Sequence, residues 1–199
     1  YKPGTFTVSS LTTLFNLLYI CGGPSDLGSY RNIEVVRRNK LYRVADLYDF
    51  LTTGNQSDNI LLQEGDLIRI PFYQSRVRIS GSIKRPGKYE MVDKDSVSGL
   101  LLYCGGFTDM AYRKKLTIFR IAEKEKMVVD LNADSFSKTQ PQSGDEYFAG
   151  NISNRFSNRV TLGGAVFRPG HYELLGELDL LSLIDNAGGL KEEAYAERV

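Results

Sequence analysis

The sequence has no tryptophan, one histidine and two cysteines in 199 residues. Histidine and cysteine are the usual ligands of zinc and of most transition metals in proteins. Their scarcity excludes a metal centre built from these side chains, so we expect no metal site and no cofactor. Twelve tyrosines and ten phenylalanines still provide enough aromatic side chains for a hydrophobic core.

An excess of charge of one sign is also missing. Lysine and arginine number 25 and aspartate and glutamate 24, which gives a formal net charge of +1. Proteins that coat nucleic acids usually carry a basic excess, because phosphate neutralisation supplies much of their affinity. We therefore expect no nucleic-acid partner.

Long apolar runs are absent as well. The richest one, Leu11 to Cys21, is interrupted by Thr12, Thr13 and Asn16. A membrane-spanning helix needs about 18 continuous apolar residues. This segment therefore contains no predicted membrane span.

The common catalytic motifs are missing too. The sequence has no Walker-type phosphate loop, no Gly-x-Ser-x-Gly, no His-Glu-x-x-His and no Cys-x-x-Cys. Carboxylates such as Asp93 and Asp95 are candidates for an acid–base pair, but they do not recur between the copies of the internal repeat in a pattern that separates them from surface charge. We predict no catalytic residues and no enzymatic activity.

An internal repeat organises the chain. Pro-Gly pairs recur every 83 residues, and a Gly-Gly pair follows each at a fixed distance; the Pro-Gly pairs are Pro3-Gly4, Pro86-Gly87 and Pro169-Gly170. The repeat predicts three domains: residues 1–75, 76–158 and 159–199. Aligned on this period, Tyr1 matches Lys84 and Val199 matches Leu116. We therefore expect repeat 1 to lack its first strand, repeat 2 to be complete and repeat 3 to hold its N-terminal half, as in a piece of a longer protein.

Each repeat predicts one short amphipathic helix. Thr13, Ser96 and Asp179 share one register and are good N-cap residues. Apolar residues follow at i, i+3, i+4 and i+7, the spacing of one buried helix face. Gly22, Gly105 and Gly188 then predict a left-handed helix end. The apolar positions are Leu14, Leu17, Leu18 and Cys21, then Val97, Leu100, Leu101 and Cys104, then Leu180, Leu183, Ile184 and Ala187.

Alternating apolar and polar residues predict strands around each helix. Pro followed by Gly predicts a type II turn between the first two strands of a repeat. The order strand, strand, helix, strand, strand indicates an α+β fold of tandem β-grasp-like repeats, each a small sheet with one packed helix. The expected strands cover residues 6–8, 33–37, 65–71, 77–81, 89–91, 116–120, 126–131, 144–148, 160–164 and 172–174.

These patterns resemble a known family. Val-x-x-x-Gly-x-x-x-Arg-Pro-Gly-x-Tyr occurs at residues 77–89 and 160–172, and a Cys/Ala-Gly-Gly-x-x-x-x-Ala segment follows at 104–111 and 187–194. Both resemble the SLBB domain, the soluble-ligand-binding β-grasp fold. Residues 65–71, Gly-Asp-Leu-Ile-Arg-Ile-Pro, are similar to the end of such units in bacterial polysaccharide export proteins.

The resemblance implies a function. Such exporters form periplasmic rings, often octameric, at the bacterial outer membrane, and carry capsule or exopolysaccharide. The expectation is a non-catalytic segment that lines or contacts the polysaccharide path, self-associates into a ring and meets other export machinery. The near-neutral net charge fits a segment that lines the path of the polysaccharide. A monomeric soluble module that binds a glycan or a small cofactor is the alternative, and a scaffold domain of a redox complex is a third.

Five residues are candidates for ligand binding or subunit contact. Lys2, Arg85 and Arg168 each precede a Pro-Gly pair, where a repeated cation would grip an anionic glycan or the next subunit. Tyr112 and Tyr195 follow the Gly-Gly pairs, where they would stack on sugar rings. The alternative for all five is ordinary solvated surface. Cys21 and Cys104, in contrast, are expected to be buried, unbridged core residues.

Overall fold

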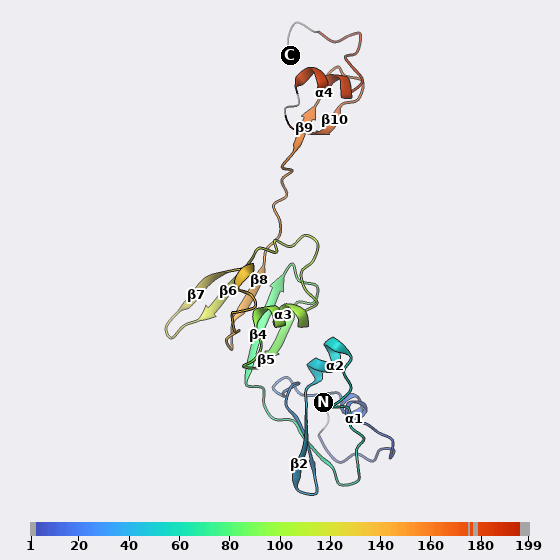
Figure 1. Cartoon of the computed structure of the whole chain (residues 1–199), viewed down its shortest axis with the longest axis vertical. Coiled ribbons are helices and arrows are strands. Elements are labelled where there is room, and N and C mark those ends of the chain that lie inside the picture. Colours follow the sequence, from blue (N-terminus) through green and yellow to red (C-terminus); the bar gives the residue numbers. More distant parts are fainter. Residues whose placement is uncertain (1–2, 175, 177–178, 196–199) are drawn as a thin grey trace. The chain divides into compact units, whose positions relative to one another are not determined.

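The fold was examined in a computed structural model of the chain, which describes residues 3–174, 176 and 179–195. The chain divides into two compact units, Tyr1–Ile152 and Ser153–Val199. The first unit contains a three-stranded and a five-stranded sheet, and the second contains a two-stranded sheet (Figure 1). The α+β class is confirmed, whereas the repeat boundaries stay predictions.

The three predicted helices are confirmed, with their caps. α1 (Leu14–Cys21), α3 (Val97–Tyr103) and α4 (Leu180–Asn186) begin after Thr13, Ser96 and Asp179. Each capping oxygen accepts a hydrogen bond from the backbone N–H three residues later, which satisfies one of the free donors of the first turn. The glycines that follow the helices all have positive φ, as a left-handed helix end requires.

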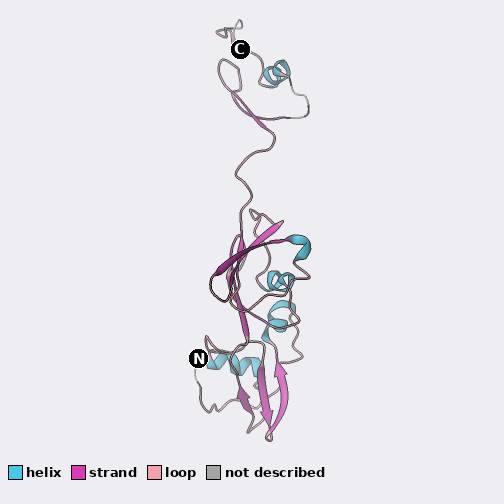
Figure 2. Cartoon of the chain, turned by 90° about the vertical axis from the view of Figure 1, so that its left-hand side faces the viewer, coloured by secondary structure: helices cyan, strands magenta, loops and turns pink. Residues whose placement is uncertain are grey.

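The second repeat forms the largest sheet, with strand order β5-β4-β8-β6-β7. β4 pairs antiparallel with β5 and parallel with β8, so it lies inside the sheet. α3 covers one side of this sheet (Figure 2), and its buried residues join those of the strands in one core. The strands are β4 (Ser75–Gly81), β5 (Gly87–Met91), β6 (Lys115–Ile121), β7 (Lys126–Asn132) and β8 (Glu146–Ala149), and a short 3-10 helix, η1 (Ala133–Ser135), follows β7.

The first repeat has a smaller sheet, ordered β2-β1-β3. Its core joins α1 residues to buried residues of β1 and β2. The elements are β1 (Ile33–Arg37), β2 (Lys40–Ala45), α2 (Leu47–Thr53) and β3 (Leu67–Arg69). Of these, β2 and α2 were not predicted from the sequence, although Asp46 caps α2 and Gly54 ends it in the left-handed conformation.

The third repeat forms a hairpin and one helix. β9 (Arg159–Leu162) pairs antiparallel with β10 (Gly170–Glu173), and α4 follows. Leu183 and Ala187 of the predicted apolar stripe are buried, whereas Leu180 is 47% exposed.

The strand predicted at residues 6–8 is wrong. This segment is the equivalent of β5, but it is not part of any strand, and Val8 lies at the surface. β5 and β10 each pair with the strand that precedes them, β4 and β9. No described residue occupies the corresponding place beside residues 6–8, so their backbone groups lack the partner that a strand requires.

The predicted type II turn is also wrong. A type II turn needs a positive φ at its glycine, but neither Gly87 nor Gly170 has one. Each of these glycines is instead the first residue of a strand, where Gly87 pairs with Ile79 and Gly170 with Leu162. The Pro-Gly pair therefore lies at the end of the connection between the two strands, where the second strand begins, and not at the centre of a turn.

The two cysteines, Cys21 and Cys104, are both free. Cys104 is fully buried, and this burial raises the pKa of its thiol. Cys21 occupies the same helix position in the first repeat but is only partly buried, which corrects the expectation of two equivalent core residues.

Candidate functional site

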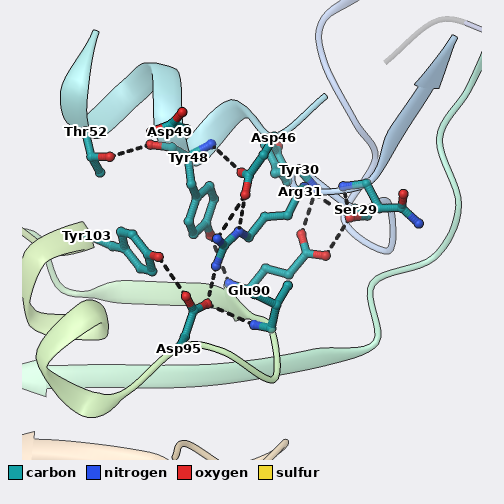
Figure 3. A network of polar contacts seen from close by, with 12 residues as sticks. Ser29, Tyr30, Arg31, Asp46, Tyr48, Asp49, Thr52, Glu90, Asp95 and Tyr103 are labelled. Carbon is teal, nitrogen blue, oxygen red and sulfur yellow. Dashed lines mark hydrogen bonds and ion pairs between the residues drawn. The ribbon is translucent and has the colours of Figure 1, made fainter. Parts of the chain in front are cut away.

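A buried arginine joins the first two repeats. Arg31 lies in the loop before β1, and its guanidinium contacts Asp46 at the start of α2 and Asp95 just before α3 (Figure 3). Nε and Nη2 donate to Asp46 Oδ2 at 3.0 and 2.9 Å, and Nη1 donates to Asp95. Only 8% of Arg31 and 7% of Asp95 are exposed. The charges are therefore taken out of water and compensate each other.

Two tyrosine rings enclose this guanidinium. The Arg31 Cζ atom lies 5.0 Å from the ring centre of Tyr48 and 5.1 Å from that of Tyr103. Burial alone would lower the pKa of Arg31, but the hydrogen bond and charge of Asp46 and the charge of Asp95 raise it above its ordinary value. Arg31 is therefore always charged, and cation–π attraction adds to its ion pairs.

Glu90 makes a second connection between the same repeats. Its carboxylate accepts hydrogen bonds from Ser29 Oγ at 2.5 Å and from the backbone N–H of Tyr30 at 2.7 Å. The backbone N–H of Glu90 donates to the hydroxyl of Tyr48 at 2.9 Å. We call these residues the junction network: Ser29, Tyr30, Arg31, Asp46, Tyr48, Glu90, Asp95 and Tyr103. The network fixes α2 against α3 and β5.

A concave surface opens beside the junction network. It has a volume of about 380 Å³, and we call it the tyrosine groove. Tyr48, Tyr89 and Tyr103 form its aromatic part, with Tyr48 in edge-to-face contact with the other two rings at centre distances of 6.5 and 5.1 Å. Burial raises the pKa of Tyr48 to about 12, so its hydroxyl stays protonated at neutral pH. The full lining is Tyr48, Leu51, Thr52, Arg85, Tyr89, Leu102, Tyr103 and Gly105.

Arg85 supplies the cation of the tyrosine groove. Its side chain is exposed, and none of the ion pairs among the described residues involves it. Its backbone is held from both sides, because its N–H donates to the Cys104 carbonyl at 3.0 Å and its carbonyl accepts from the Tyr89 hydroxyl at 2.7 Å. The same corner recurs in the third repeat, where Tyr172 donates to the Arg168 carbonyl. Tyr89 and Tyr172 are half-buried residues of this corner.

Comparison with family models identifies the repeats. The SLBB domain model matches residues 2–45, 76–130 and 159–199, which is more than half of the chain. The chain belongs to the SLBB domain family. No curated protein matches the chain.

SLBB domains are soluble-ligand-binding modules, so membership indicates that this chain contains modules of the ligand-binding kind. Among the residues that the structure describes, no group of three or more histidine, cysteine, aspartate or glutamate residues is placed to hold a metal ion. In the same part of the chain, no helix has the length and apolarity that a membrane crossing requires. Asp95, considered above as an acid, is instead a buried partner of Arg31 and Tyr103.

Four of the five predicted site residues lie in the described part of the chain, and one of them lines the tyrosine groove. Arg85 lines the tyrosine groove, whereas Tyr112 is exposed and does not line it. Arg168 and Tyr195 are exposed residues of the second compact unit. Lys2 lies outside the described residues. The expectation of a contact repeated in every SLBB unit therefore stays a prediction.

Most of the junction network and two of the three groove tyrosines were not predicted from the sequence. Three of these residues have no charged or aromatic equivalent in another repeat: Val129 stands at the position of Asp46, Thr12 at that of Asp95, and Ile20 and Asn186 at that of Tyr103. The sequence did contain a signal for them, because a charged or aromatic residue found in one copy alone indicates a contact made once, at a junction between copies.

Proposed function

We propose that this SLBB chain binds an anionic polysaccharide in the tyrosine groove, as a non-catalytic segment of a periplasmic capsule or exopolysaccharide export protein at the bacterial outer membrane. One observation carries the proposal. The groove combines three tyrosine rings with an exposed arginine that forms no ion pair with another described residue.

The two arginines of this region differ in whether their guanidinium group is free to contact a ligand. Arg31 is buried and already paired with Asp46 and Asp95. Arg85 is exposed, and its planar guanidinium matches a carboxylate with two parallel hydrogen bonds. Tyrosine rings present a flat apolar face and a polar hydroxyl, which suits the mixed apolar and hydroxylated surface of a sugar. The groove therefore favours acidic sugars over neutral ones.

The export context rests on other features. Tandem SLBB units and the Gly-Asp-Leu-Ile-Arg-Ile-Pro segment resemble export proteins, and the net charge of +1 suits a wall that lets a polymer move on. Ring assembly and contact with further export machinery are part of this proposal. The second candidate is a monomeric module that binds a glycan in the same groove.

Calorimetric titration of the 199-residue chain tests glycan binding. The probes are an oligogalacturonate, which is anionic, and a malto-oligosaccharide of equal length, which is neutral. We expect saturable binding of the anionic probe at low salt. Arg85→Gln should weaken it by about tenfold to a hundredfold, because a charge-assisted hydrogen bond is lost.

Arg168→Gln is the matched control, because Arg168 occupies the same corner of another repeat. It should leave the affinity within about twofold of the unchanged chain, since isolated surface substitutions have small effects. Equal binding of both probes, or equal loss in both variants, contradicts the proposed groove. Negative-stain microscopy of the full-length protein separates the two candidates: rings support the exporter, and monomers that bind the anionic probe support the binding module.

A further inference from the structure

The five-stranded sheet of the second repeat ends in a free edge. β7 is the last strand of this sheet, and among the residues that the structure describes it pairs only with β6 (Figure 1). All seven residues of β7, Lys126–Asn132, pair with β6 without a register shift. The backbone N–H and C=O groups on the other side of β7 therefore form a regular row that can pair with a further strand.

Proteins usually protect such an edge, and the first repeat does so. β2 has the corresponding place in the three-stranded sheet, and its pairing with β1 contains a register shift. β2 also carries two cations, Lys40 and Arg43. A bulge and like charges both disfavour the addition of another strand. β7 has no bulge and carries one cation, Lys126, and one anion, Asp130, so it lacks the protection that β2 has.

The side chains of β7 alternate between the two faces of the sheet. Leu131 is buried in the core on the side of α3, whereas Lys126, Val128 and Asp130 lie on the opposite face. Val128 is 64% exposed and lies opposite Phe119 of β6, which is 39% exposed. The free edge therefore carries an apolar residue with a cation two residues before it and an anion two residues after it.

This order of charges is self-complementary. When two β7 strands pair antiparallel with Val128 opposite Val128 of the partner subunit, Lys126 lies opposite Asp130 of the partner subunit, and the reverse pair forms as well. A shift by one residue in either direction would place Val128 opposite Asp130 or Lys126. Opposite charges and apolar residues stabilise cross-strand pairs, and like charges destabilise them. One register is thus favoured.

Both charged residues are available for this contact. Lys126 is exposed, and none of the ion pairs among the described residues involves it. Asp130 accepts from Lys115 at 3.0 Å and from Thr117 at 3.1 Å, but its side chain is 55% exposed. A carboxylate has about four acceptor positions, so Asp130 can contact a further cation.

We propose that β7 is a pairing site for a second copy of this chain, through an antiparallel β7–β7 contact centred on Val128. The contact is isologous, so it joins two chains into one continuous sheet and does not by itself build a ring. Phe119 and Val128 of both subunits then form one apolar strip on the face opposite α3. The pairing does not depend on glycan binding, since no residue of the tyrosine groove belongs to β6 or β7.

Sedimentation velocity of the 199-residue chain between about 1 and 500 μM tests the pairing. A single strand pair buries little surface, so we expect a weak dimer with a Kd on the order of tens of micromolar. Asp130→Lys or Lys126→Asp should each raise this Kd by at least about tenfold, because like charges then face each other twice. The double variant exchanges the two charges and should return the Kd to within about threefold of the unchanged chain.

Amide hydrogen exchange locates the contact. Between the lowest and the highest concentration, exchange in residues 126–132 should slow by about threefold to tenfold, and exchange in residues 40–45 of β2 should not change. Phe148→Ser is the matched control, because Phe148 is exposed on the same face but lies on β8, inside the sheet. It should leave the Kd within about twofold.

Four results would overturn the proposal. The first two are a monomer at every concentration and a double variant that dimerises as weakly as the single variants. The other two are a Kd raised by Phe148→Ser as much as by Asp130→Lys, which would indicate packing of two sheet faces, and slowed exchange at β2 in place of β7.

Discussion

At the scale of single residues, Arg31 is the central side chain of the junction between repeats 1 and 2. It contacts two carboxylates and two tyrosine rings that come from two parts of the chain, the start of α2 and the segment of α3. Ion pairs of this kind add little net stability compared with a well-packed apolar core, but breaking one leaves a buried charge without compensation. The junction is therefore sensitive to the loss of one partner.

Arg31→Ala should lower the free energy of unfolding of the first compact unit by about 3–5 kcal/mol, because Asp95 stays buried without its cation. Arg31→Lys should cost less, since it keeps the charge while losing the planar contact with the rings. Urea unfolding followed by circular dichroism measures both. Arg78→Ala, at an exposed position of β4, is the control and should change stability by no more than about 0.5 kcal/mol. A similar small effect for Arg31→Ala would show that the network does not hold the repeats together.

At the scale of elements, local signals predicted the helices and most strands well. Thr13, Ser96 and Asp179 cap their helices as expected, because an N-cap acts on backbone groups only three residues away. The prediction failed where an element depends on a distant partner. Residues 6–8 carry a strand pattern but no described strand pairs with them. α2 was overlooked because the second repeat has only the short 3-10 helix η1 at the corresponding place.

One long-range contact is repeated between elements. Arg37 at the end of β1 donates Nε and Nη2 to Asp66 at 2.8 Å each, and Arg120 at the end of β6 donates to Asp145 at 2.8 and 2.7 Å. Each aspartate also accepts the backbone N–H of a glutamine three residues earlier. The aspartate of the Gly-Asp motif therefore connects neighbouring strands through its contact with an arginine.

The hydrogen bond from Arg37 holds the pKa of Asp66 below its ordinary value of 3.8. A carboxyl whose pKa is lower in the folded state stabilises that state above its unfolded pKa, and this stability is lost as the pH falls through the folded value. Asp66→Asn should therefore lower the urea midpoint at pH 6, and the difference from the unchanged chain should shrink below about pH 4. Asp109→Asn, at a fully exposed position, should show no such pH dependence. A constant difference across this pH range would contradict the assignment.

At the scale of the whole molecule, the repeat predicted the fold but not the candidate site. An 83-residue period describes what the copies share, whereas the tyrosine groove is formed between α2 of one repeat and α3 and the Arg85 corner of the next. Arg85 was predicted because it is repeated; Tyr48 and Tyr103 were not, because each occurs in one copy. The candidate site of this chain thus lies at a junction between repeats and includes residues that the shared pattern of the repeats does not contain.

The central claim is that the tyrosine groove contacts an exported anionic polysaccharide through Arg85. The most direct measurement is the amount of surface polysaccharide in cells whose full-length protein carries Arg85→Gln, compared with Arg168→Gln at equal protein levels. The account predicts a clear reduction, about tenfold if export follows the affinity of one charge-assisted contact, for Arg85→Gln alone. Unchanged surface polysaccharide in the Arg85→Gln cells would contradict it.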